Sequence, residues 1–128
     1  MTSDCEPHQV EPFVADEEYL WRRLLPSWIT SESVGTPRIS SIAFIDRRSG
    51  EVSVHRAQYS TKEAALRNHP EHSLAEIVTK IPRSLGHDVV ADPTIEDPSH
   101  ALIRPPEGAS HGRRKKDAKR MAEASRLV

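Results

Sequence analysis

Two short apolar runs, at residues 89–91 and 101–103, each have the length of a brief strand. Two Asp-Pro pairs separate them. Proline lacks an N–H group and favours extended conformations in the residue before it, so no helix crosses this segment. The pattern predicts two strands joined by a stiff acidic loop, with His100 at the start of the second strand.

A second pair of strands is predicted farther towards the N-terminus. Residues 39–45 and 51–55 both alternate between apolar and polar positions, and the residues between them favour a turn. Together they predict a β-hairpin. Ile42 and Phe44 would share its buried face and would meet two valines of the second strand across the pair.

Helical patterns are expected on both sides of this hairpin. Residues 16–25 begin with three acidic side chains and place Leu20 and Leu24 one turn apart. Pro26 would end that helix. Residues 60–63 fit a capping box and predict a second, short helix.

Residues 74–85 allow two interpretations. Their apolar spacing fits one helix, but Pro82 would lie inside it and would cost on the order of 3 kcal/mol. We favour a strand near residues 75–79, followed by a helical turn that begins at Pro82 and ends at Gly86. One kinked helix is the alternative.

The C-terminal residues 113–128 favour a helix, with one stripe of small residues and basic residues over most of the remainder. The predicted elements indicate an α+β fold, in which a small, mostly antiparallel sheet carries short helices and a peripheral basic C-terminal helix. Residues 1–16 are expected to form a disordered acidic lead-in. Residues 17–106 would form a single domain, and 107–128 a linker and the basic helix.

The composition limits the size of the core. Apolar residues form 36% of the chain and charged residues 29%, so part of the chain must lie outside the core. The net charge of −1 conceals an asymmetry, because residues 1–18 carry six acidic and no basic side chains. Residues 113–128 carry seven basic and two acidic ones. Two such ends can contact each other or a charged partner.

Several classes of site and location are excluded by what the sequence lacks. Cys5 is the single cysteine, so neither an intramolecular disulfide nor a cysteine-based zinc site can form. The N-terminus lacks the apolar segment of a secretory signal, and no apolar stretch approaches the roughly 20 residues that span a bilayer. We expect a cytoplasmic protein that has no membrane partner and needs no cofactor.

Candidate chemistry is concentrated in the loop between the two C-terminal strands. The residues there that could bind a divalent metal are Asp92, Glu96, Asp97 and His100. Acid–base catalysis would use His100 and the two aspartates, with His55 as a contributor from outside the loop. The structural alternative, which we favour, is that the aspartates form turns before proline and that His100 hydrogen-bonds to the loop.

Some familiar catalytic signatures are absent. The sequence contains no glycine-rich phosphate loop and no His-Glu-x-x-His motif. Ser40, Ser41 or Ser99 could act as a nucleophile beside a histidine, but no pattern selects one of them. These observations make an enzyme the less favoured class.

Five short segments carry a resemblance to known proteins. They are Trp-Arg-Arg-Leu-Leu-Pro at 21–26, Ser-Ser-Ile-Ala-Phe at 40–44, Gly-Glu-Val-Ser-Val at 50–54, Arg-Ser-Leu-Gly at 83–86 and Asp-Pro-Thr-Ile-Glu-Asp-Pro-Ser-His-Ala at 92–101. Across residues 19–104 the chain resembles short bacterial proteins to which no function is assigned. The resemblance implies a bacterial origin and one compact unit, and it assigns no catalytic residue.

Basic residues near the C-terminus are candidates for binding nucleic acid or an acidic partner. They are Arg113, Arg114, Lys115, Lys116, Lys119 and Arg120. Sparse aromatic residues and a neutral middle of the chain argue against nucleic acid. We favour a non-enzymatic accessory module that binds a protein partner. The alternatives are a small toxin-like or metal-dependent hydrolase that uses the 92–100 loop, and a nucleic-acid-binding accessory protein.

Overall fold

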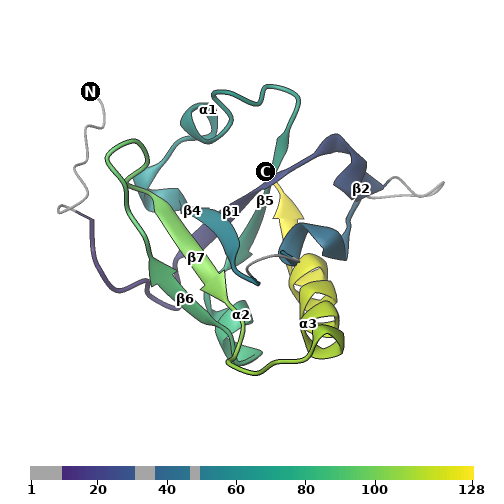
Figure 1. Ribbon diagram of the computed structural model, residues 1–128. Coiled ribbons are helices and arrows are strands. Elements are labelled where there is room, and N and C mark those ends of the chain that lie inside the picture. Colours follow the sequence, from purple (N-terminus) through teal and green to yellow (C-terminus); the bar gives the residue numbers. More distant parts are fainter. Residues whose placement is uncertain (1–9, 31–36, 47–49) are drawn as a thin grey trace.

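The computed structural model of this chain describes residues 10–30, 37–46 and 50–128. Its strands are β1 (Tyr19–Leu24), β2 (Ile29–Thr30), β3 (Arg38–Ile39), β4 (Val52–Arg56), β5 (Ser73–Val78), β6 (Asp88–Ala91), β7 (His100–Arg104) and β8 (Arg126–Leu127). Its α-helices are α1 (Lys62–Ala65), α2 (Lys80–Ser84) and α3 (His111–Ala124), and its 3₁₀ helices are η2 (Pro26–Trp28), η3 (Ser41–Phe44) and η4 (Ala57–Tyr59). The predicted α+β class is confirmed (Figure 1). Within these ranges no helix has the length and apolar character needed to cross a membrane.

A six-stranded sheet organises the described part of the molecule. Its strand order is β6-β7-β4-β1-β5-β8, and every neighbouring pair is antiparallel. Side chains alternate along each strand, so one sheet face receives the large apolar residues. That face forms the core with α3 and η3 packed against it. β2 and β3 form a separate two-stranded sheet.

The helix predicted for residues 16–25 is wrong, because β1 is a central strand of the sheet between β4 and β5. Leu20 and Leu24 lie on one face of a strand as well as of a helix, since a spacing of four fits both periods. Arg22 lies between them on the same face. This polar residue interrupts the alternation of apolar and polar residues by which a strand is predicted. Its side chain donates to the carbonyls of Ala43 (2.7 Å) and Ser53 (3.1 Å). Burial lowers the pKa of Arg22 to about 10.

The hairpin predicted for residues 39–55 is also wrong. The Ser40 hydroxyl accepts a hydrogen bond from the Ile42 N–H (3.3 Å) and caps η3, which replaces most of the expected first strand. η3 places Phe44 in the core and leaves Ile42 43% exposed. β4 pairs instead with β1 and β7. Of the turn expected at 46–50, residues 47–49 lie outside the described part of the chain.

The C-terminal half follows the sequence closely. β6 and β7 form the predicted strand pair, and β5 followed by α2 confirms the strand-and-turn interpretation of residues 74–85. α2 begins two residues before Pro82, and Gly86 follows it with a φ of +90°, which favours glycine. The short helix α1 is present, but Thr61 rather than Ser60 accepts the capping hydrogen bond.

α3 confirms the predicted C-terminal helix as far as Ala124, and the helix expected for residues 125–128 is wrong, because Arg126–Leu127 form β8 beside β5. The small-residue stripe of α3 is part of the core. Ala118, Met121 and Ala122 are buried among the strand residues of the core face. The Ser110 hydroxyl accepts a hydrogen bond from the Arg113 N–H (3.1 Å) and caps the helix. α3 therefore belongs to the same packed unit as the sheet.

The disorder expected for residues 1–16 is wrong for residues 10–16, and residues 1–9 lie outside the described part. Val10 and Val14 are buried, at 6% and 1% exposure. Val14 joins the core that the sheet shares with α3. The ordered unit therefore begins before the predicted boundary at residue 17.

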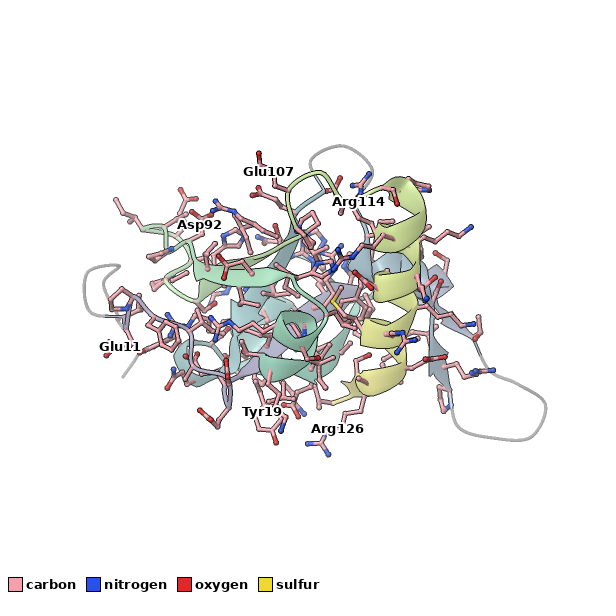
Figure 2. All side chains as sticks on the ribbon, turned by 90° about the horizontal axis from the view of Figure 1, so that it is seen from below. Glu11, Tyr19, Asp92, Glu107, Arg114 and Arg126 are labelled. Atoms are coloured by element: carbon pink, nitrogen blue, oxygen red, sulfur yellow. The ribbon has the colours of Figure 1, made fainter. Side chains whose placement is uncertain are left out.

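The described acidic residues near the N-terminus do not meet the basic helix. Asp16 pairs with Arg83 on α2 (2.7 Å), and Glu18 pairs with Arg56 on β4 (2.8 Å). Figure 2 shows Glu11 on the opposite side of the molecule from α3. The attraction expected between the charged ends is therefore not made by these residues.

Candidate functional site

The pairing of β4 with β7 sets His55 directly opposite His100. The next pair along the ladder is hydrogen-bonded, since the Arg56 N–H donates to the Ser99 carbonyl (2.8 Å). Hydrogen-bonded and non-hydrogen-bonded pairs alternate in antiparallel sheets, so His55 and His100 form the second type, in which side chains lie closer. Both rings lie on the sheet face opposite the core.

His55 is held by a carboxylate from the loop between β6 and β7. Its Nδ1 lies 3.0 Å from Asp97 Oδ2, while Asp97 Oδ1 accepts from the Ser99 hydroxyl (2.5 Å) and the Ser99 N–H (3.1 Å). Burial opposes ionisation of Asp97, but the hydrogen bonds from His55 and Ser99 outweigh it and lower its pKa to about 2. An ionised carboxylate can only accept, so it holds the proton of His55 on Nδ1.

His100 is held in the same way by Asp92. Its Nδ1 lies 2.9 Å from Asp92 Oδ2 and 3.2 Å from the Asp92 carbonyl oxygen. Among the described residues, neither histidine has a hydrogen-bond partner at Nε2. An imidazole fixed at Nδ1 by a carboxylate offers its Nε2 lone pair to a proton or a metal ion.

The structure brings together His55, Asp97, His100 and Asp92, which sequence reasoning had named as the possible catalytic set. It separates them into two carboxylate–imidazole pairs, and Glu96 is exposed beyond both. The four predicted metal ligands do not form a cluster with ligand atoms within 4.8 Å of one another among the described residues. The turn interpretation describes Asp97 well, because its side chain accepts from the N–H two residues on.

The serines do not complete a nucleophilic site. Ser99 is 1% exposed, and its hydroxyl lies 3.3 Å from His55 Nδ1, the nitrogen that already faces Asp97. Residues 108–112 read Gly-Ala-Ser-His-Gly, which is the spacing of a serine nucleophile turn. In the structure Ser110 caps α3, and no histidine in the described ranges hydrogen-bonds to it.

An open hollow of about 320 Å³ lies away from the histidines. It is lined by Gly50, Glu51, the segment 104–109 and Arg114. Figure 2 places Arg114 beside α3 and Asp92 on the other side of the molecule, with Glu107 between them. None of the residues of the two histidine pairs lines this hollow.

The six predicted cationic residues of α3 fall into two groups. Arg113 donates to the Leu85 carbonyl (2.9 Å) and lies 3.4 Å from Asp117, and Arg114 is half-buried beside Gly50. The other four are exposed and form no ion pair with any described residue. We call them the cationic face of α3; they are Lys115, Lys116, Lys119 and Arg120.

Sequence reasoning missed a buried pair that fixes α3 in place. His87 Nε2 lies 2.8 Å from Asp117 Oδ2, and the two residues are 6% and 7% exposed. A signal for it exists in the sequence, because Asp117 precedes Met121 by four residues and so lies on the stripe that α3 buries. An acidic side chain on a buried stripe indicates a polar partner.

Replacing Asp97 with asparagine should reduce the free energy of unfolding at neutral pH by about 1 kcal/mol, less than its pKa shift implies because the side chain is partly exposed. A carboxylate whose pKa is lowered stabilises the fold above its ordinary pKa, near 4, and loses that contribution as the pH falls towards 2. Urea unfolding at pH 7, 4 and 2.5 should therefore show a smaller pH dependence for the variant. The matched control is Asp92→Asn, which removes a carboxylate that is more exposed. Equal pH dependence for Asp97→Asn and the unmodified protein would contradict this assignment.

Comparison with protein-family models, with curated proteins and with solved structures finds no match. The resemblance to short bacterial proteins stays a prediction. What this chain does must therefore be inferred from its own geometry, and two surfaces carry that inference. One presents the carboxylate-held histidines, and the other is the cationic face of α3.

Proposed function

We propose that this protein is a binding module that docks an acidic protein surface onto the cationic face of α3. The observation that carries the proposal is the cluster of four exposed cations without an acidic partner in the described part of the chain. Lys115 and Lys119 are four residues apart, as are Lys116 and Arg120. The four side chains therefore form one contiguous patch.

The patch is held on a rigid support. The opposite side of α3 is buried in the core through Ala118 and Met121, and Asp117 ties the helix to His87. Like charges four residues apart on a helix destabilise it by about 0.2–0.5 kcal/mol per pair. The fold therefore maintains an unfavourable charge cluster, and an anionic partner would remove that repulsion. A preordered surface also loses little conformational entropy on binding.

An acidic protein fits this face better than a nucleic acid. Tight DNA binding commonly uses about 6–10 phosphate contacts, which exceeds what four cations can provide. α3 also carries no Phe, Tyr or Trp on which a base could stack.

Acid–base chemistry at the paired histidines is a second candidate function. The free Nε2 atoms of His55 and His100 favour it, since each can accept a proton. The position of the large hollow, which none of the four site residues lines, is against it. Binding through α3 is therefore the better supported function.

Reversing three charges on α3 should weaken binding of a glutamate-rich 20-residue peptide by about tenfold or more, because each exposed ion pair contributes about 0.2–1 kcal/mol. The test variant is Lys115→Glu/Lys116→Glu/Lys119→Glu. Its matched control is Lys62→Glu/Arg67→Glu/Lys80→Glu, which changes the net charge equally at exposed positions outside α3. Fluorescence anisotropy at 50 and 150 mM salt measures both, with a 20-base-pair DNA duplex as the competing probe.

Retained peptide affinity in the control and loss in the α3 variant would support the proposal. Equal losses in the two variants would show that net charge, rather than this face, governs binding. A clear preference of the unmodified protein for the duplex, with a steep salt dependence, would favour the nucleic-acid alternative. Absence of binding to both probes at 50 mM salt would reject the proposal.

A further inference from the structure

The turn between α1 and β5 carries three potential metal ligands in four residues. It reads His69-Pro70-Glu71-His72 and leads directly into β5. The His72 N–H donates to the His69 carbonyl (2.9 Å), which closes the turn. Pro70 fixes its own φ near the value that the second position of such a turn requires. The backbone that carries these three side chains is therefore already ordered without a bound metal.

The closed turn brings the ligand atoms of its three polar side chains together. One ligand atom each from His69, Glu71 and His72 lies within 4.8 Å of the others. The two imidazole rings stack with their centroids 4.7 Å apart and an angle of 15° between their planes. His72 Nε2 lies 3.4 Å from Glu71 Oε2.

The imidazole nitrogens of this cluster are poorly satisfied by the protein. His72 Nδ1 is buried without a hydrogen-bond partner. Neither ring nitrogen of His69 has a hydrogen-bond partner among the described residues. Buried polar atoms of native proteins are nearly always satisfied, and an exception indicates a missing water or ion. Two imidazoles and a carboxylate whose ligand atoms lie within 4.8 Å of one another, together with an unsatisfied imidazole nitrogen, favour a metal ion.

We propose that His69, Glu71 and His72 bind a zinc ion. Two imidazole nitrogens and one carboxylate oxygen are a donor set typical of zinc, which prefers four ligands in a tetrahedron. With metal–ligand distances of about 2.0–2.2 Å, tetrahedral donors lie about 3.3 Å apart. The ligand atoms lie within 4.8 Å of one another, somewhat farther apart than this. The Glu71 side chain is 60% exposed, so it can rotate and bring its carboxylate closer to the imidazoles. Three protein ligands leave the fourth position to a water molecule or to a ligand from a partner.

Zinc at this position would stabilise the start of β5. His72 immediately precedes the strand, and β5 pairs with both β1 and β8. A metal that binds the folded turn more tightly than the unfolded chain raises the melting temperature through mass action. The site shares no residue with the cationic face of α3, so the zinc and peptide-binding proposals can fail independently.

The test is a zinc titration of the full chain at pH 7.5 against a colorimetric chelator, together with thermal unfolding with and without zinc. We expect one zinc ion per chain and a higher melting temperature in its presence. His69→Ala and His72→Ala should each lower zinc affinity by about 100-fold, since each removes a ligand, and Glu71→Gln by about tenfold. His111→Ala and His100→Ala should bind zinc like the unmodified protein, because neither residue belongs to the turn.

Circular dichroism of each variant establishes that it is folded. If His72→Ala fails to fold, His72→Asn and His69→Ala provide the same comparison. Absence of zinc binding to the unmodified protein would overturn the proposal. Binding that persists in the double variant His69→Ala/His72→Ala would place the metal elsewhere and would overturn it too. Loss of binding in His100→Ala alone would assign the metal to the strand histidines instead.

Discussion

Replacing Arg56 with methionine is expected to reduce the free energy of unfolding by about 3–5 kcal/mol, the range found when one partner of a buried ion pair is removed. Arg56 is fully buried, at 0% exposure, and its carboxylate partner Glu18 is 11% exposed in its side chain. The variant would leave the Glu18 carboxylate desolvated and without its counter-ion. Urea unfolding at neutral pH measures the loss.

The contacts of Arg56 explain why the expected loss is large. Its Nε and Nη2 donate to the two oxygens of Glu18, at 2.9 and 2.8 Å. Its Nη1 and Nη2 donate to the carbonyls of Glu11 (2.5 Å) and Phe13 (3.3 Å), and the guanidinium lies 4.8 Å from the Tyr59 ring centroid. Burial opposes ionisation of Glu18, but hydrogen bonds, mainly from Arg56, lower its pKa. One side chain thus ties β4 to the N-terminal segment.

A double-mutant cycle separates the ion pair from its surroundings. Glu18→Gln should also destabilise the protein, and the double variant should lose less than the sum of the two single losses. Arg104→Met is the control, because it breaks a partly exposed pair with Glu51 and should cost about 0–1 kcal/mol. Hydrogen exchange in Arg56→Met should rise in residues 11–18 before other parts of the molecule. An Arg56→Met variant as stable as Arg104→Met would contradict the buried role of this pair.

Replacing Phe44 with alanine should likewise cost about 3–5 kcal/mol, since it removes a buried aromatic ring and leaves a cavity. Phe44 is 2% exposed and belongs to the core that α3 and the sheet share. It lies among Val52, Ile103 and Met121, from two strands and α3. The ring therefore packs η3 against both the sheet and α3. No single neighbour can fill the cavity that its removal leaves.

Ile42→Ala is the matched control, and it also tests the secondary structure of this segment. In a strand, Ile42 and Phe44 would face the same way, so both substitutions would be costly. In η3, Ile42 is 43% exposed, and its truncation should change stability by about 0.5 kcal/mol or less. Denaturant midpoints of the two variants decide between the structures. Similar losses in both would indicate a strand.

The sequence determined those elements whose apolar pattern and turn chemistry agree. β6 and β7 are short apolar runs separated by Asp-Pro pairs, and the β5–α2 boundary follows from the position of Pro82. Local preference and tertiary structure favour the same conformation there. The amphipathic α3 was predictable for the same reason, because its small residues lie on one stripe.

The sequence-based predictions were wrong at β1 and at residues 40–44. Arg22 interrupts the alternation of β1, yet it is satisfied by the carbonyls of Ala43 and Ser53, which are 21 and 31 residues away. The alternating pattern around Ser40 predicted a strand, but its hydroxyl begins η3 and the core accepts Phe44 in that form. In both places the deciding hydrogen bond or contact depends on the fold around it.

The candidate site was likewise predictable only in part from the sequence. Residue chemistry alone named Asp92, Asp97 and His100 in one loop and added His55 from a distant segment. Only the register of β4 against β7 decided that His55 contacts Asp97 while His100 contacts Asp92. The pairing of two strands fixes which side chains meet, and a one-residue shift in register would turn every side chain of a strand to the other face.

For this protein, the sequence by itself determined the α+β class, the C-terminal strand pair, the basic helix and the residue types available for chemistry. Tertiary structure decided which charges are neutralised and which remain free. Arg56 is buried against Glu18, 38 residues away, whereas Lys115 and Lys119 have no acidic partner among the described residues. The physical reason is that charge energetics depend on burial and on distances between atoms, and folding sets both between residues that are far apart in the chain.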